Sequence, residues 1–305
     1  MIGSAFPFTS CQERDKNGKI VDTPTSGQIK IGVDESLRPL FEAEVDTFMS
    51  LYQYSSILPR YGSEPDIIDA FLKDSVRLAI ITRKLTQEES DVLAKQKIYP
   101  RQSKVAKDGI AVILNNGNAD SLLHFDQFKD ILSGKITRWN QLNSTSKLGD
   151  LEVVFDHPQS GIIRFLKDSV FQMEHLPKNF YGVNSNKEVI DYISKKTNAI
   201  GLIGLSWISD RDDSTTNQFL KAIRVARISR SGDEAVQPYQ AYIATGQYPL
   251  RRDVYIISRE FRAGLGLGFT SFVAGEKGQR IVLKLGMVPA TLPVRLVEIT
   301  KRKIQ

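Results

Sequence analysis

The sequence predicts an α/β fold with a mostly parallel sheet, and two observations support this prediction. From residue 28 to residue 115, apolar stretches of strand character alternate with amphipathic helical stretches in the order β-α-β-α-β-α-β. A second series of helices and strands follows between residues 125 and 208. With 305 residues, the chain can form one large domain or two domains of ordinary size.

The first unit begins with a strand at 28–34, where apolar side chains recur at every second position. An amphipathic helix follows at 35–53, and Ser36 is its predicted N-cap. After a second strand, Ser63 and Asp66 show the capping-box pattern of a short helix. The other elements expected in this unit are a strand at 76–83, a helix at 86–97 and a strand at 107–116.

The second unit begins with a helix that Gly134 ends. Its other predicted elements are a strand at 150–156, helices at 160–172 and 186–196, and a strand at 199–208. Near the C-terminus we expect a strand at 251–260, helices at about 264–274 and 276–285, and Gly286 as the last C-cap.

Composition argues against several classes of protein. Hydrophobic residues make up 41% and charged residues 25%, as is usual for globular proteins. The net charge of +6 comes from Lys and Arg spread along the chain, so we expect a solvated basic surface and no nucleic-acid partner. No apolar run reaches the length of about eighteen residues that would predict a membrane-spanning helix.

Metal sites, cofactors and enzymatic activity are not expected. Cys11 is the one cysteine, so no disulfide can form within the chain, and the three histidines lack ligand spacing. The stretch "GLGLGF" at 264–269 does not directly follow a strand, so we interpret it as tight helix packing rather than a dinucleotide loop. Neither a Walker loop nor a nucleophile with its base is readable, so the chain is predicted not to be an enzyme.

The N-terminus resembles the end of a lipoprotein signal peptide. Small and apolar residues precede Cys11, and the sequence then turns abruptly polar up to residue 27. It lacks a basic region and a full apolar core, so a truncated start is one interpretation and a disordered tail with a chance cysteine is the alternative. We predict a signal remnant and polar linker at 1–27, with a lipid on Cys11 as membrane anchor.

Three strand-to-helix junctions carry a serine at or near the helix start. They are Ser36, Ser63 and Ser160. In open α/β sheets, ligands bind outside the carboxyl ends of strands, where helix N-termini present unpaired N–H groups to an anion. Each serine alone is explained by ordinary capping, but three such junctions in two units favour an anion site.

Several stretches occur in the order typical of one family, and through them the chain resembles type II periplasmic binding proteins. Within that family it is similar to the phosphate-binding component of the bacterial phosphate ABC transporter. The resemblance is carried by "GVDESLRPLFEAEVDTF", "VRLAIITRKLTQEE", "DGIAVILNNGNADSLLHFDQFKDILSGKITRWNQL", "NAIGLIGLSWI", "YPLRRDVYII" and "FTSFVAGEKGQRIVLKLGMVPA".

The resemblance implies two α/β lobes that are joined by two crossover strands and close on a ligand. Lobe one would comprise 28–112 plus 236–298, and lobe two 113–235. It further implies a monomeric, extracytoplasmic solute-binding lipoprotein that delivers phosphate or a related small oxyanion to ABC permease subunits. Such a protein would lie in the periplasm or at the outer face of the cytoplasmic membrane.

Position by position, the resemblance also implies the binding loops. They are Asp34-Glu35-Ser36, Gly62-Ser63, Thr82-Arg83 and Ser160-Gly161-Ile162.

Four departures from the family pattern bear on the ligand. The first-lobe turn reads "GSEPD", with Glu64 and Asp66 at the helix start, where relatives carry a Gly-Ser-Gly-Thr-like turn. Asp156 stands where phosphate-binding relatives carry an Arg, Ile162 replaces a Thr, and Arg83 replaces an acidic residue. An uncompensated carboxylate about 4 Å from an anion costs on the order of 4 kcal/mol at an effective dielectric constant near 20. We therefore interpret Asp156 as a selectivity element.

Two arrangements would reconcile Asp156 with a ligand. Arg83 could pair with Asp156 across the cleft as a latch, or Asp156 could form a hydrogen bond with a protonated oxyanion or with a neutral or zwitterionic ligand. The alternative function is a sensory or interaction protein on the same fold, with an altered or lost ligand site.

Overall fold

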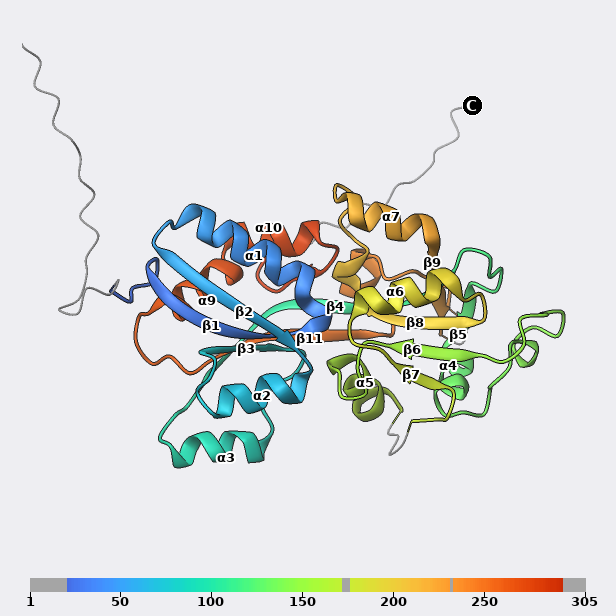
Figure 1. Cartoon of the computed structure of the whole chain (residues 1–305), viewed down its shortest axis with the longest axis horizontal. Helices are drawn as coiled ribbons and strands as arrows, with labels where there is room; N and C mark the ends of the chain where they lie inside the picture. Colours follow the sequence, from blue (N-terminus) through green and yellow to red (C-terminus); the bar gives the residue numbers. More distant parts are fainter. Residues whose placement is uncertain (1–20, 172–175, 231–232, 293–305) are drawn as a thin grey trace, which may run out of the picture.

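The computed structural model describes residues 21–171, 176–230 and 233–292, which form two α/β lobes side by side (Figure 1). One sheet runs through both lobes in the order β2-β1-β3-β11-β4-β8-β6-β7. Strand β4 (Arg101–Asn115) joins them, because residues 101–109 pair with β11 (Arg251–Ser258) and residues 110–114 pair with β8 (Ala199–Gly204). The predicted α/β fold with two lobes is confirmed.

Lobe one is built on a parallel trio of strands whose central member is β1. Strand β11 then pairs antiparallel with β3. The strands of this lobe are β1 (Gly27–Asp34), β2 (Ser55–Gly62) and β3 (Leu78–Ile81), and its helices are α1 (Arg38–Leu51), α2 (Glu64–Leu72), α3 (Gln87–Lys95), α9 (Leu265–Ala274) and α10 (Glu276–Lys284).

Helices cover both faces of that sheet. Helices α1, α9 and α10 pack on one face over Ile31 and Val33, and α2 and α3 pack on the other over Ala79 and Ile81. All four side chains of β3 are buried, as expected of a strand that is covered on both sides.

Lobe two continues the sheet from the second half of β4. Its strands are β6 (Glu152–Phe155), β7 (Phe180–Gly182), β8 and β9 (Ile223–Val225), with β5 (Leu122–His124) and β10 (Arg227–Ser229) in a small separate sheet. Its helices are α4 (Phe125–Leu132), α5 (Gly161–Phe165), α6 (Asn186–Lys195), α7 (Ser214–Ala222) and α8 (Gln240–Thr245). The short strand β12 (Val288–Pro289) returns to pair with β4.

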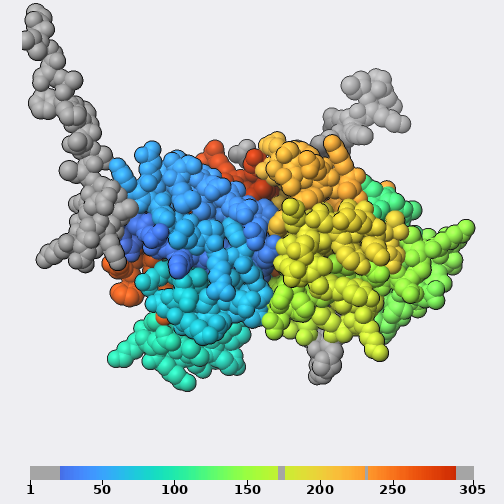
Figure 2. All heavy atoms as spheres, in the orientation of Figure 1, coloured from blue at the N-terminus to red at the C-terminus, as the bar shows by residue number. Residues whose placement is uncertain are grey.

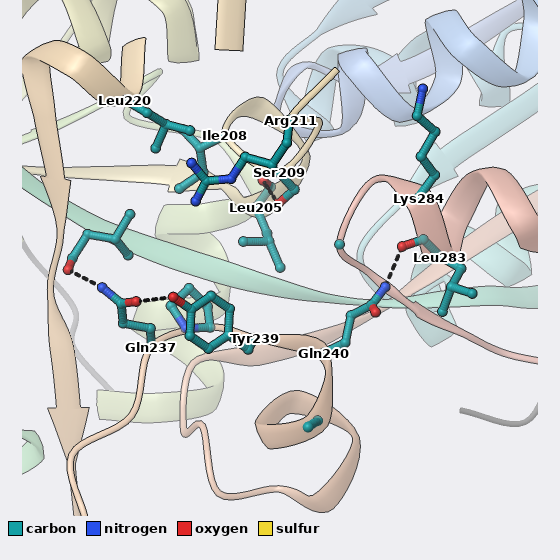
Figure 3. Close-up of a pocket in the computed structure, with 14 residues that line it drawn as sticks. Leu205, Ile208, Ser209, Arg211, Leu220, Gln237, Tyr239, Gln240, Leu283 and Lys284 are labelled. Atoms are coloured by element: carbon teal, nitrogen blue, oxygen red, sulfur yellow. Dashed lines mark hydrogen bonds between the residues drawn. The ribbon is translucent and has the colours of Figure 1, made fainter. Parts of the chain in front are cut away.

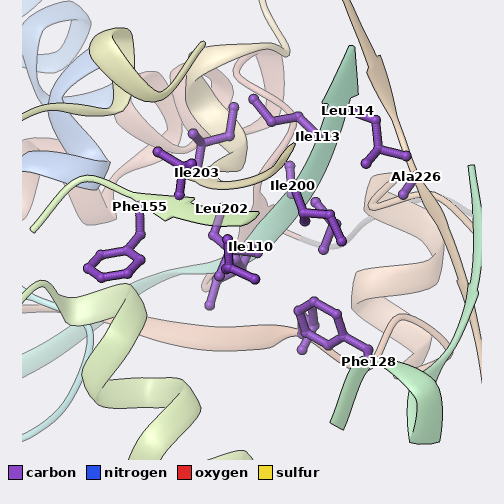
Figure 4. Close-up of a cluster of buried hydrophobic side chains, with 14 of the residues drawn as sticks. Ile110, Ile113, Leu114, Phe128, Phe155, Ile200, Leu202, Ile203 and Ala226 are labelled. Carbon is purple, nitrogen blue, oxygen red and sulfur yellow. The ribbon is translucent and has the colours of Figure 1, made fainter. Parts of the chain in front are cut away.

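The core of lobe two lies around the second half of β4 (Figure 4). There Ile110 and Ile113 pack with Leu202, Phe155 and Phe128 from neighbouring elements. This core also includes Val236, Ile243, Tyr248 and Leu250. The family resemblance implies that 236–298 belongs to lobe one, whereas these four residues pack in the core of lobe two and the chain returns to lobe one along β11.

Several predicted features differ in detail. Ser36 does not cap α1: Glu35–Leu37 forms a 3₁₀ turn capped by Asp34, and α1 begins at Arg38. The predicted helix at 160–172 divides into α5 and a π-helical segment at Leu166–Phe171. Short elements such as β5, β7, β9, β10 and α8 were not predicted, because three to six residues carry too little periodicity.

The predicted turn glycines behave as expected. Gly134 and Gly286 adopt φ values of 77° and 78°, the left-handed conformation favoured after a helix. In "GLGLGF", a side chain at Gly268 would strike the carbonyl of Pro24, and the N–H groups of Gly266 and Leu267 donate to Glu260. This agrees with tight helix packing.

The signal remnant and Cys11 lie outside the described residues. Within the described ranges, no helix has both the length and the apolar character needed to cross a membrane. In the same ranges, His, Cys, Asp and Glu residues do not gather in threes around a possible metal position.

Candidate functional site

The predicted loops of the two lobes meet at the interface between them. Gly161, at the start of α5, lies so close to lobe one that a Cβ there would be 3.0 Å from Thr82 Oγ1 and 3.1 Å from Glu64 Oε2, and closer still to Asp34. A Cβ at Gly204 would likewise strike the carbonyl of Ser36. The lobes are therefore closed on each other, and in Figure 2 they meet along a continuous seam.

Asp34 organises the first loop because β1 ends there. Its Oδ1 accepts the backbone N–H of Ser36 at 3.0 Å and the Ser36 hydroxyl at 2.5 Å. The same hydroxyl accepts a hydrogen bond of 2.7 Å from Nη2 of Arg252. Ser36 is therefore already engaged by groups of the protein rather than open to solvent.

The side chain of Asn186 bridges the lobes at the start of α6. Its backbone N–H donates to Glu35 Oε2 at 3.0 Å, and its side-chain amide also contacts Glu35. The same amide group donates to Asp156 Oδ2 at 3.2 Å, and its oxygen accepts from the N–H of Gly204 at 2.9 Å. No sequence pattern indicated this residue, since one Asn at a helix start is common.

Carboxyl groups dominate this interface. Burial raises the pKa of Glu35 to about 8, and the neighbouring charge of Asp156 adds to the rise. Burial also raises the pKa of Asp156 to about 7, with a further contribution from Asp34. One oxygen of each of these three carboxyl groups is buried without a hydrogen-bond partner among the described residues.

The predicted latch between Arg83 and Asp156 is not formed. Arg83 instead binds Glu64 at 2.6 Å and Glu89 at 2.7 Å, and both partners belong to lobe one. Among these loops, an ion pair between the lobes joins Arg164 to Glu64 at 2.7 Å, and Arg164 Nη2 also donates to Thr82 Oγ1 at 3.1 Å. Arg164 could have been found in the sequence, because it lies one helical turn after Ser160 on the same face.

The remaining predicted residues have structural roles. Ser160 accepts the N–H of Ile163 at 3.3 Å and Ser63 accepts that of Asp66 at 3.5 Å, so both predicted N-caps are confirmed. The side chain of Ile162 is fully buried in the core of lobe two. It therefore cannot replace the hydroxyl expected there in a binding loop.

A buried ion pair lies in the crossover strands themselves. Arg252 on β11 donates to Asp108 Oδ2 on β4 at 3.0 and 2.9 Å, and the two side chains are 1% and 0% exposed. Because Arg252 also binds Ser36, it connects the crossovers to the first loop. Its positive charge also lowers the pKa of Asp156, against the larger effect of burial.

A cavity that the sequence did not predict lies away from these loops (Figure 3). It has a volume of about 610 Å³ and is bounded by the turn after β8 and by α8 and α10. Its polar side chains bind neighbouring groups, as when Gln237 donates to Val225 O at 2.9 Å and Gln240 donates to Leu283 O at 2.5 Å. None of the predicted binding residues lines it.

Known proteins are similar to this chain over most of its length. The profile described as the PBP superfamily domain matches residues 21–277. The phosphate-binding protein PstS of Staphylococcus saprophyticus is 22% identical over 258 residues, which cover 83% of this chain and 77% of that protein. PstS of Staphylococcus aureus strain USA300 is 22% identical over 80% of this chain and 72% of its own length.

Solved structures show the same fold. A putative phosphate ABC transporter substrate-binding protein from Clostridium perfringens, with bound phosphate, superposes with a TM-score of 0.72 at 24% identity, covering 87% of this chain and all of that one. An ABC-type phosphate transport receptor from Vibrio cholerae gives a TM-score of 0.64 at 18% identity, covering 86% of this chain and all of that one.

Proposed function

The chain belongs to the PBP superfamily, and from this premise we propose that it is the extracytoplasmic solute-binding component of an ABC importer. Its family is one of binding proteins, in agreement with the prediction that the chain is not an enzyme. The proposed solute is phosphate or a related small oxyanion, since the relatives above are named for phosphate. In this proposal the protein is a monomer, anchored by a lipid on Cys11, that delivers its solute to ABC permease subunits.

One observation carries the proposal. The two lobes are connected through β4 and β11, and the loops after β1, β3 and β6 face each other across the interface. Rotation about two connecting strands would separate these loops and expose a cleft, which is the hinge motion expected of a bilobed binding protein. The contacts of Gly161 and Gly204 then correspond to the closed state.

Phosphate would meet an unusual environment between the lobes. Asp34, Glu35, Glu64 and Asp156 contribute carboxyl groups there, and the cations that contact this set are Arg38, Arg83, Arg164 and Arg252. Because the pKa of Asp156 is near 7, its protonated form can donate a hydrogen bond to an oxyanion below that pH. Phosphate binding should therefore weaken as the pH rises through that value.

Isothermal titration tests this function directly. The purified protein is titrated with phosphate at about pH 6 and about pH 8, with sulfate as control and thermal denaturation as a second readout. We expect saturable heat, with a smaller dissociation constant at the lower pH. Absence of both heat and thermal stabilisation at millimolar phosphate, at either pH, would remove the phosphate assignment but not the fold.

A second candidate function is a sensory or interaction protein whose ligand site is lost. The closed interface favours it, because Arg164–Glu64 and Asn186–Glu35 join the lobes through side chains of the protein itself. Two observations discriminate between the functions: which genes lie next to the gene for this protein, and which membrane protein co-purifies with it. An adjacent ABC permease that co-purifies with the protein supports transport, whereas a different membrane partner supports the second function.

A further inference from the structure

A second cavity, of about 430 Å³, lies beside the closed loops and is here called the basic cavity. Both lobes and both crossover strands contribute to it. Of its eleven lining residues six are cationic and one, Asp253, is acidic. The cationic residues are Arg83, Lys84, Lys107, Arg164, Arg251 and Arg252.

Neighbouring carboxylates neutralise only part of this charge. Arg83 and Arg164 bind Glu64, as described above, and Asp253 is itself bound by Lys104 at 2.7 Å. Lys84, Lys107 and Arg251 form no ion pair with any carboxylate in the described parts of the chain. These three cations therefore have no ion-pair partner, although the charge of Asp253 acts on Lys107 and Arg251 Nη1 donates to Ile243 O at 3.4 Å.

Lys107 and Arg251 lie close together on the paired crossover strands. Residues 107 and 253 are partners in the β4–β11 register, as are residues 109 and 251. The pKa of the Lys107 amine is lowered, first by burial and then by the charges of Arg251 and Lys104. Two like charges held together in this way are stabilised by an anion between them.

Arg252 provides independent evidence, because one of its guanidinium nitrogens lacks a hydrogen-bond acceptor. Its side chain is 1% exposed, and two of its nitrogens bind Asp108 and Ser36. Its Nη1 is buried and has no hydrogen-bond acceptor among the residues that the structure describes. An unpaired guanidinium N–H is costly to bury, and Arg252, which lines the basic cavity, therefore keeps part of its hydrogen-bonding capacity unused.

We propose that the basic cavity binds a diphosphate group. Arg and Lys are the side chains that recognise phosphoryl oxygens, and a volume near 430 Å³ falls within the range of small-ligand sites. Cations from lobe one, lobe two and the crossovers line one space, which suits a multiply charged anion better than a single orthophosphate. The inference rests on the proposed function, since it keeps the oxyanion class and moves the anion away from the carboxylate-filled loops.

Calorimetric titration with inorganic pyrophosphate, and separately with orthophosphate, tests the inference. The variants are the double substitution Lys107→Gln/Arg251→Gln and the single substitution Ser160→Ala in the loop of lobe two. The charge-matched control is Lys73→Gln/Arg280→Gln, because those side chains are 68% and 70% exposed on lobe one. Circular dichroism confirms that each variant is folded.

We expect pyrophosphate to bind more tightly than orthophosphate. The Lys107→Gln/Arg251→Gln variant should lose about a hundredfold in affinity, because each lost charge-assisted contact is worth about tenfold or more. The charge-matched control should stay within about threefold of the wild type, since it removes no charge-assisted contact to the anion. Ser160→Ala should lose less affinity than Lys107→Gln/Arg251→Gln, because it removes no charge from the basic cavity.

Other outcomes separate this inference from the proposed function. Suppose that an oxyanion binds, that Lys107→Gln/Arg251→Gln leaves its affinity unchanged and that Ser160→Ala abolishes binding. The basic cavity is then not the binding site, and the proposed function stands. Equal losses of affinity in both double variants would show that net charge alone weakens binding. This result would also refute the assignment of the anion to the basic cavity. If neither anion produces heat with the wild-type protein, the oxyanion assignment falls and the inference falls with it.

Discussion

Raising the pH from about 5.5 to about 8.5 should open the interface between the lobes, because buried carboxyl groups there lose protons. Glu35 and Asp156 both contact Asn186, and burial raises their pKa to about 8 and about 7. For an acid with a raised pKa in the closed state, the stabilisation is full below its ordinary pKa. It is lost as the pH rises through the raised value.

The loss of interface stability can be worked out from the pKa shifts of Glu35 and Asp156. Each pKa unit corresponds to ~1.4 kcal/mol, so Glu35 loses roughly 3 kcal/mol between about pH 5.5 and its pKa near 8, and Asp156 roughly 2 kcal/mol. The charges that face these groups are Asp156 and Arg38 next to Glu35, and Asp34 and Arg252 next to Asp156. The sum is an upper bound, because it assumes that separation of the lobes returns both carboxyl groups completely to water.

Small-angle X-ray scattering measures the opening. The radius of gyration of the wild-type protein should increase between the two pH values, whereas Glu35→Gln/Asp156→Asn should stay compact at both. Glu44→Gln is the matched control, because burial raises the pKa of Glu44 to about 9 but its carboxyl group does not contact Asn186. An unchanged radius in the wild type, or equal expansion in the double variant, would refute the reasoning.

Three further substitutions test the closed interface and the hinge. Gly161→Ala should hold the lobes apart, because its Cβ would collide with lobe one; scattering that matches the wild type would contradict this. Glu64→Gln should reduce the unfolding free energy by about 1–3 kcal/mol, since it leaves the part-buried Arg164 without its carboxylate; urea denaturation measures the loss. Tyr248→Phe should cost ~1 kcal/mol in the same assay, because the hydroxyl donates to Ile110 O at 2.7 Å; an unchanged midpoint would show that the bond contributes nothing.

The sequence by itself determined the order and type of the main elements. Period-two and helical patterns predicted β1, α1, β3, β8 and the last two helices, because these signals depend on residues close in the chain. The caps at Ser63 and Ser160 were likewise readable, since a cap involves residues only three positions apart. The family resemblance then supplied the arrangement in two lobes, which periodicity alone does not contain.

Only the tertiary structure decided which side chains of the site contact one another. Arg164 and Glu64 are 100 residues apart, and Arg252 and Ser36 are 216 residues apart, so local sequence patterns carry no information about either contact. The sequence identified Arg83 as a charged residue of the site, but its carboxylate partners depend on how α2 and α3 pack beside β3. Side chains at an interface pair according to distance and burial, and both are set only when the two lobes dock.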